Sequence, residues 1–197
     1  MNNIQNQISN ATCENHYPLL HQYIKSKYTP FNILSFGSSN GSEVNDLKKT
    51  FPNSIIHGLE INKDLVAKCN SNNMNKNIMF YDNIDNLKFN TYDLITCISV
   101  LCRWPDSSEY TFELFEKTIQ QIDNLLNDNG IFILINSKFL FSETKFFKNY
   151  EIENVLPELI FNPGKGIGRG HDWMPKYHKD GTKCNTKPPV IFRKKKY

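Results

Sequence analysis

Long apolar runs are missing from this chain of 197 residues: none approaches the roughly 20 residues that a membrane-spanning helix needs. The first ten residues lack the basic start and the apolar stretch of a secretory signal peptide. The five cysteines are odd in number and form no CxxC pair, which argues against a disulfide framework or a zinc ribbon. These absences predict a soluble, cytoplasmic protein with reduced thiols and no membrane partner.

Neither sign of charge dominates, because 23 basic and 20 acidic side chains leave a net charge of only +3. Charged residues make up 22% and hydrophobic residues 39% of the chain, which excludes a disordered polyelectrolyte and favours a packed core. The basic excess lies largely in residues 193–196, and a solvated tail is its simplest interpretation. Nucleic acid is thus a possible but not a favoured partner.

Strand-like and helix-like periodicities alternate along the chain, with no internal repeat. The pattern predicts helices over residues 17–28, 44–51, 63–69 and 112–126, and strands over residues 31–36, 54–60, 78–81, 92–100 and 131–135. Asn129 and Gly130 are expected to end the last helix through a left-handed cap. Apolar runs of this length favour parallel strands covered on both faces, so we predict an α/β sandwich.

The length predicts a single domain over residues 1–197. Residues 1–30 would form a leading helical region, and residues 31–136 the regular core. Residues 137–197 depart from the alternating rhythm. There we expect a strand or helix near residues 152–161, a loop over 162–189 and a last strand over 190–193, with the last two strands as a hairpin at the sheet edge.

The segment ILSFGSSNGSEV, residues 33–44, has the pattern of a strand, a tight glycine turn and a helix. Glycine permits positive φ and close approach of the backbone to a ligand. A dinucleotide-binding G-x-G-x-x-G motif would need glycine where this chain has Ser39 and Ser42, and no G-K-[ST] follows for a Walker-type loop. The turn is therefore predicted to bind a ligand other than a pyrophosphate.

Acidic residues follow the second and third predicted strands. Glu60 ends the second strand, where a carboxylate can accept both hydroxyls of a ribose. Asp82 and Asn83 follow the third strand. The simpler alternatives are a charged strand end for Glu60 and an ordinary turn for the other two.

The glycine turn resembles motif I of the class I S-adenosylmethionine-dependent methyltransferases, in particular the serine-rich variant of the chemotaxis receptor methyltransferases. G-S-S-N-G-S-E stands where that family has a pattern close to G-C-S-T-G-E-E. Residues 92–101 resemble the family's fourth strand, and residues 125–134 resemble its L-L-x-P-G-G turn and fifth strand. Five segments thus match in the right order over residues 31–136.

The resemblance implies a Rossmann-like three-layer α/β/α sandwich, with a mostly parallel seven-stranded sheet and a C-terminal antiparallel hairpin. It also implies S-adenosyl-L-methionine as the cofactor. Most of the superfamily has an acid where this chain has Ser35, and Glu43 could take over that task. The residues that the resemblance assigns to the donor are Gly37, Ser38, Ser39, Asn40, Gly41, Glu43, Glu60, Ile61, Asp82, Asn83, Ser99 and Val100.

Two further segments carry candidate groups for the methyl acceptor. In the first, Arg103 could grip an anionic acceptor, Trp104 could pack on a sugar or base, and Asp106 could be catalytic. Asp106 has a simpler interpretation as the N-cap of the following helix. In the second, His171 precedes an aspartate and is a candidate general base, with Trp173 as a substrate contact.

The sequence offers no clear metal site and no nucleophilic cysteine. The spacing of His171, His178 and Cys184 fits no standard zinc pattern, so no metal is expected. Cys97 and Cys102 are interpreted as packing groups at a buried strand end.

We therefore predict a methyltransferase that acts on a small polar acceptor, with a sugar or glycan hydroxyl as the favoured one. The sulfonium is intrinsically reactive, so the protein's main task would be to hold acceptor and methyl in line and to exclude water. The alternatives are an RNA or protein methyltransferase and a catalytically silent S-adenosylmethionine-binding module. A nicotinamide dehydrogenase is the least favoured alternative. The sequence does not predict the oligomeric state.

Overall fold

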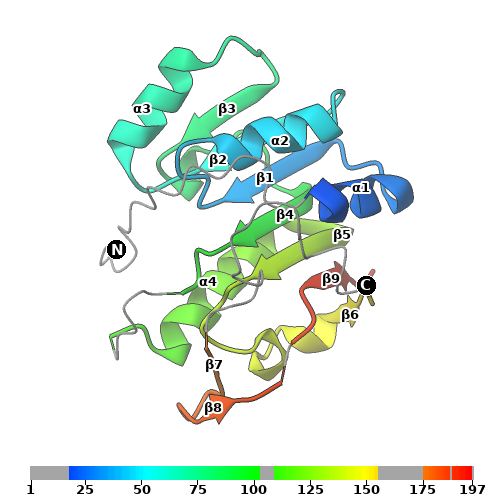
Figure 1. The fold of residues 1–197 in the computed structure, drawn as a ribbon, viewed down its shortest axis with the longest axis vertical. Helices are drawn as coiled ribbons and strands as arrows, with labels where there is room; N and C mark the ends of the chain where they lie inside the picture. Colours follow the sequence, from blue (N-terminus) through cyan, green and yellow to red (C-terminus); the bar gives the residue numbers. More distant parts are fainter. Residues whose placement is uncertain (1–17, 103–108, 155–174, 187, 197) are drawn as a thin grey trace.

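The computed structural model describes residues 18–102, 109–154, 175–186 and 188–196. Its main sheet has seven strands in the order β3-β2-β1-β4-β5-β9-β6 (Figure 1). The five strands from β3 to β5 are parallel, whereas β9 is antiparallel to both β5 and β6. A separate antiparallel pair, β7 and β8, lies outside this sheet at the lower edge of Figure 1. The predicted fold class is confirmed.

The strands are β1 Asn32–Phe36, β2 Ile55–Leu59, β3 Ile78–Tyr81, β4 Tyr92–Ile98, β5 Leu126–Ile135, β6 Tyr150–Ile152, β7 Lys176–Tyr177, β8 Lys183–Cys184 and β9 Ile191–Lys194. The α-helices are α1 Pro18–Lys27, α2 Ser42–Thr50, α3 Lys63–Asn72 and α4 Phe112–Leu125. Three short 3-10 helices complete the described chain: η1 Ile84–Asn86, η2 Phe141–Glu143 and η3 Phe147–Asn149. None of the described helices is long and apolar enough to cross a bilayer.

Two hydrophobic clusters lie on opposite faces of the main sheet, because successive residues of a strand point to opposite sides. Ile33 of β1 belongs to the cluster that includes buried residues of α1, α2 and α3. Its neighbour Leu34 belongs to the other cluster, with Phe115, Ile119 and other residues of α4. The sheet is thus covered on both faces, which explains its continuous apolar strands.

Local signals set where the helices begin. Asn62 caps α3, since its Oδ1 accepts hydrogen bonds from the amides of Asp64 and Leu65. Thr111 is the cap of α4 and accepts from the amide of Leu114. The interpretation of Asp106 as the cap of this helix is therefore wrong, because the helix begins too late for it.

The junction between α4 and β5 differs from the prediction. We expected Asn129 and Gly130 to end the helix through a left-handed cap, but α4 ends at Leu125 and Leu126 is already extended. Asn129 does have a left-handed φ of 61°, within the span of β5. The turn that it makes comes after the helix and leads into the buried part of the strand.

The region after β5 departs most from expectation. Strand β6 overlaps only the start of the strand or helix expected near residues 152–161, most of which lies outside the described residues. The segment expected to be a loop contains β7 and β8. The expected edge hairpin is the antiparallel pair β6 and β9. The basic tail is not simply solvated: Arg193 lies in β9 beside Glu151, and Lys194 Nζ lies 3.5 Å from Asp123 Oδ1.

Candidate functional site

The candidate site lies at the carboxyl ends of the parallel strands. Chain order runs outward from β1 to β2 and β3 on one side, and to β4 and β5 on the other. In open α/β sheets, ligands bind at the carboxyl edge where the strand order reverses in this way. In this chain that position is the end of β1, which leads into the glycine turn.

The glycine turn is held against the end of β2. The amides of Gly37 and Ser38 both donate to the carbonyl oxygen of Leu59, at 2.7 and 2.9 Å. Gly37 has a φ of 79°, and a Cβ on it would lie 2.3 Å from Cγ2 of Val100. Because only glycine fits so close to Val100 and adopts this φ without strain, the turn depends on it.

The other residues of the turn divide between folding and ligand contact. Gly41 and Ser39 have φ of 80° and 48°. The side chain of Asn40 bonds within the turn, since its Oδ1 accepts hydrogen bonds from the amide and the hydroxyl of Ser42. The hydroxyl oxygen of Ser38 is buried and has no hydrogen-bond partner within the described chain. A buried orphan hydroxyl in a loop of this kind marks a place where a polar ligand group fits.

Glu43 and Ser35 meet below the turn. Ser35 Oγ donates to Glu43 Oε2 at 2.6 Å, so the helix supplies a carboxylate at the position of the strand serine. Burial raises the pKa of Glu43, and the hydroxyls of Ser35 and Thr96 partly offset that effect. Glu43 thus directly contacts Ser35, which occupies the strand position where most of the superfamily has an acid.

Glu60 lies against the same turn from the end of β2. Its Oε2 accepts from the amide of Ser39 at 2.9 Å, and its Oε1 accepts from the amide of Asn62 at 3.0 Å. A carboxylate has about four acceptor positions, so two remain for ligand hydroxyls. The next residue, Ile61, is 46% exposed, which is unusual for a large apolar side chain and places an apolar surface beside the carboxylate.

Asp82 and Asn83 follow β3, one strand further out. Asp82 Oδ2 lies 3.9 Å from Lys63 Nζ, and Asn86 Nδ2 donates weakly to Asp82 Oδ1 at 3.4 Å. Asn83 caps the 3-10 helix η1, since its Oδ1 accepts from the amide of Asp85. Asp82 therefore retains acceptor capacity, while the side chain of Asn83 is already used in the turn.

Ser99 and Asn136 connect the exits of β4 and β5. Both have left-handed backbones, with φ of 58° and 56°, and Asn136 Nδ2 donates to Ser99 Oγ at 2.9 Å. Left-handed residues other than glycine are strained and cluster at functional sites. Sequence reasoning found Ser99 and missed Asn136, although an asparagine directly after a buried strand was a usable signal.

The predicted acceptor residues cannot be compared with this geometry. Arg103, Trp104, Asp106, His171 and Trp173 all lie outside the described residues. The described part of the chain holds no group of three or more metal-ligating side chains. The cysteines Cys97 and Cys102 are buried and half-buried, and burial raises the pKa of both thiols, which agrees with a packing role.

A backbone ladder on the acceptor side was not predicted from the sequence. The carbonyl of Leu101, just past β4, accepts from the amide of Lys138 at 2.7 Å. The carbonyl of Lys138 in turn accepts from the amide of Tyr177 in β7 at 2.9 Å. The short hairpin of β7 and β8 is thereby attached to the carboxyl ends of β4 and β5.

The described residues fit a nucleoside-containing cofactor at this edge of the sheet. A glycine turn approaches closely, Glu60 and Asp82 provide acceptors on neighbouring strands, and Ile61 offers an apolar surface. The buried hydroxyl of Ser38 and the carboxylate of Glu43 stand at the inner end of the same turn. The resemblance assigned these residues to the S-adenosylmethionine site, and that assignment stays a prediction.

A solved structure shows the same fold. A plantazolicin methyltransferase, BpumL, in complex with a triazolic desmethylPZN analog and SAH, has a TM-score of 0.56 at 14% identity, over 91% of this chain and 83% of that chain. In two other BpumL structures the match spans 46% and 48% of that chain, less than half its length. The O-methyltransferase from a trans-AT PKS multienzyme of Brevibacillus brevis matches at 16% identity over 70% of this chain and 43% of that chain, with a TM-score of 0.47.

A family model described as a methyltransferase domain matches residues 30–181, more than three quarters of the chain. No curated protein matches this chain. The chain belongs to this methyltransferase domain family. At the level of that family, the prediction of a methyltransferase domain is confirmed.

Proposed function

We propose that this chain transfers a methyl group from S-adenosylmethionine to a hydroxyl of a small polar acceptor, with a sugar or glycan hydroxyl as the favoured target. The observation that carries the donor half of this proposal is the pair of carboxylates on the glycine turn: Glu43 beneath it and Glu60 across its Ser39 amide. The hydroxyl as methyl acceptor rests on the polar and acid-base side chains in the two predicted acceptor segments.

Each donor residue has a specific task in this proposal. Glu60 accepts hydrogen bonds from the ribose hydroxyls through its two remaining acceptor positions, and Ile61 packs on the adenine. Asp82 accepts from the adenine amino group, one strand away. Glu43, held by Ser35, faces the positive amino group of the methionine part. Opposite charges in a half-buried site favour each other strongly, which suits a cationic donor.

The chemistry requires little more than position. The bound donor supplies an electrophilic methyl group on a sulfonium, and the acceptor oxygen must approach it in line. The strained exits at Ser99 and Asn136, together with Val100 over the glycine turn, hold the rim of the site in one conformation. The predicted contacts Arg103, Trp104, His171 and Trp173 would orient the acceptor.

Recognition of RNA is less well supported than a small acceptor. The basic tail is engaged within the fold, since Lys194 Nζ donates to the carbonyls of Asp123 and Leu126, and Arg193 lies beside Glu151 and Glu153. Charges that are already paired contribute less to binding of phosphates. Binding to RNA that weakened steeply with salt would revive this alternative.

Calorimetry with S-adenosylmethionine, S-adenosylhomocysteine and NAD tests the donor half of the proposal. We expect both adenosyl ligands to bind and NAD to show no heat of binding. Transfer of a radiolabelled methyl group to a panel of nucleotide sugars and free monosaccharides then tests the acceptor. If neither adenosyl ligand binds, the chain has the methyltransferase fold without the activity, and the proposed function is wrong. If methyl transfer occurs only to RNA or protein, the proposed sugar acceptor is wrong.

A further inference from the structure

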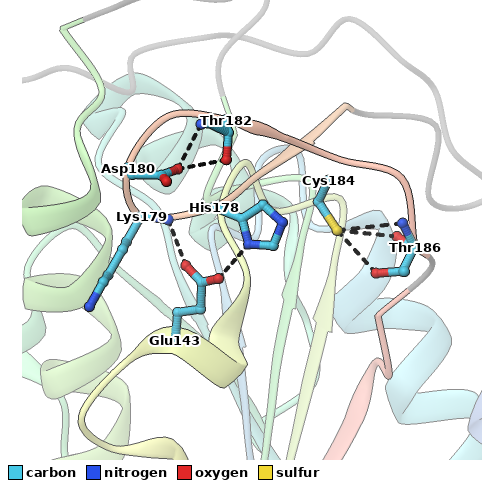
Figure 2. A network of polar contacts seen from close by, with 7 residues as sticks. All are labelled: Glu143, His178, Lys179, Asp180, Thr182, Cys184 and Thr186. Carbon is cyan, nitrogen blue, oxygen red and sulfur yellow. Dashed lines mark hydrogen bonds and ion pairs between the residues drawn. The ribbon is translucent and has the colours of Figure 1, made fainter.

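A histidine and a glutamate from separate elements meet beside the carboxyl ends of β4 and β5. His178 directly follows β7, and its Nδ1 lies 2.5 Å from Oε1 of Glu143 at the end of η2. The other oxygen of Glu143 accepts from the amide of Lys179 at 2.6 Å. Figure 2 shows the carboxylate facing the ring, with Cys184 on the ring's other side.

The hairpin turn fixes the backbone of this histidine. The amide of His178 donates to the carbonyl of Thr182, and the amide of Gly181 donates back to the carbonyl of His178, at 2.8 and 2.9 Å. Asp180 closes the turn by accepting from both the amide and the hydroxyl of Thr182 (Figure 2). The ring is therefore presented by a rigid turn and oriented by one carboxylate.

The position of the turn connects it to the donor site. Leu101, Lys138 and Tyr177 are joined by successive backbone hydrogen bonds, and Phe139 forms a further bridge with Tyr177. Neighbouring backbones in such a ladder lie about 4.8 Å apart, so Tyr177 is roughly 10 Å from Leu101. Leu101 follows Val100, which lies over the glycine turn. The histidine thus lies on the side from which an acceptor would reach the methyl group.

The side chains of this pair are partly exposed. The side chain of His178 is 40% exposed, and that of Glu143 24%. Within the described chain, no residue hydrogen-bonds to Nε2 of His178. A partly exposed histidine with one ring nitrogen hydrogen-bonded to a carboxylate is the arrangement of an oriented general base.

We propose that His178, oriented by Glu143, is the general base that removes the proton from the acceptor hydroxyl. The proposal rests on the proposed function. In the step, the acceptor oxygen forms a bond to the methyl carbon while the bond from carbon to sulfur breaks. The electron pair of that bond stays on sulfur, which becomes a neutral thioether. The hydroxyl proton passes to Nε2 of His178, and the resulting imidazolium is stabilised by Glu143.

Electrostatics at the pair support this role. Glu143 raises the pKa of His178 through its hydrogen bond and its charge, and Cys184 and Asp180 add smaller effects in the same direction. The partner shift is reciprocal, because the pKa of Glu143 is lowered by His178 and by the amide of Lys179, against its own desolvation. A more basic imidazole accepts a proton more readily once it is in its neutral form.

The first experiment needs no acceptor. If His178 and the sulfonium flank one acceptor atom, the positive charge of S-adenosylmethionine must lower the pKa of His178 relative to neutral S-adenosylhomocysteine. We expect a difference of about 0.5 pH unit or more, measured by NMR titration of the imidazole in the two complexes. Equal pKa values in two saturated complexes would overturn the assignment, while failure of both ligands to bind would overturn the proposed function and this assignment with it.

The second experiment separates catalysis from support of the hairpin. His178→Asn keeps a side-chain amide near the position of Nδ1, so the contact to Glu143 can persist while Nε2 is lost. With a nucleotide sugar that the wild type methylates, we expect turnover to fall by about 10²–10⁴, with unchanged S-adenosylhomocysteine affinity and melting temperature. Lys183→Ala, an exposed change on β8, is the matched control and should retain turnover.

The pH dependence of turnover in Glu143→Gln is a further test of the general base. The substitution should lower the pKa of His178, shift the acid limb of turnover to lower pH and reduce the plateau. Full activity of His178→Asn, or a loss confined to His171→Ala, would overturn the proposal and leave His171 as the candidate base.

Discussion

The donor side and the hairpin side of this protein are built on different physical bases. From β1 to β4, each strand is followed by a helix or turn close in sequence, and the residues proposed for the donor lie in the segments that follow these strands. After β5, contacts join distant segments: Lys194 reaches Asp123, and His178 reaches Glu143. Residues that follow regular strands suit the binding of one constant ligand. Loops held by long-range contacts can vary in sequence, and so can adapt to different acceptors.

Histidines on the two sides have opposite environments. His57 in β2 is fully buried, stacks on Phe89 at 4.7 Å and shares a hydrogen bond with Tyr92. Burial lowers its pKa to about 4, and burial lowers that of His21 in α1 to about 4 as well. The pKa of His178 is raised by Glu143 instead. The core therefore resists protonation, while the hairpin favours it.

The largest effect is expected from Gly37→Val, which should abolish donor binding. A Cβ there would lie 2.3 Å from Val100, and the φ of 79° strains any residue with a side chain. Calorimetry with S-adenosylhomocysteine measures the loss. Gly181→Ala is the matched control in the hairpin, because its φ is 85° but no atom lies within 4 Å of the added Cβ. Donor binding that survives Gly37→Val would mean that the loop is merely a turn.

Glu60→Ala should weaken donor binding by about 1.5–3 kcal/mol, roughly 10-fold to more than 100-fold. The loss has two sources, since the carboxylate would bind the ribose and also holds the Ser39 amide in place. Glu60→Gln keeps a single acceptor for that amide and should bind with intermediate affinity. Unchanged affinity in the alanine variant would remove Glu60 from the site.

Acid should destabilise the core before it affects the hairpin. Between pH 6.5 and about 4 the unfolded chain binds protons at His21 and His57 that the folded chain does not, so the free energy of unfolding falls as the pH falls. The expected loss is on the order of 2–3 kcal/mol for each histidine. Denaturant unfolding at several pH values measures it.

His21→Leu is the test variant for that loss, because neither ring nitrogen of His21 has a hydrogen-bond partner within the described chain. Its stability should depend less steeply on pH than that of the wild type over the same range. Identical slopes would show that His21 titrates normally in the folded protein.

Alkaline pH should instead loosen the hairpin. The contribution of His178 is complete below about pH 6.5, its unfolded pKa, and disappears as the pH rises through its raised folded pKa. Hydrogen exchange at the amide of Lys179, which donates to Glu143, reports this contact. After correction for the intrinsic rate, protection of that amide should fall with rising pH in the wild type and stay constant in His178→Asn.

The smallest effect is expected at the strained exits of β4 and β5. Asn136→Ala should lower stability by about 1–2 kcal/mol, because alanine tolerates the left-handed backbone poorly and loses the bond to Ser99. Asn129→Ala has nearly the same φ but lies outside the site, so it should share the loss of stability and spare donor binding. Asn136→Gly removes the backbone strain and should recover part of the loss.

The sequence alone was sufficient to predict the strands, the helices and the glycine turn of the donor side. The glycine turn, the acids at Glu60 and Asp82 and the small exit at Ser99 are each readable from a few neighbouring residues. The cap of α4 was placed wrongly because two polar segments compete to begin that helix, and only packing of its apolar face selects Thr111. His178 could not be assigned, because its partner Glu143 lies 35 residues away in the chain.

The sequence by itself determined the alternating strands and helices, the parallel core and the glycine turn, since each follows from hydrophobic periodicity and backbone preferences over short windows. The tertiary structure decided which distant side chains meet. It inserted β9 between β5 and β6, tied the basic tail to α4 and brought Glu143 to His178. These contacts join residues that are far apart in the sequence and depend on how the elements pack together, so no local sequence pattern predicts them.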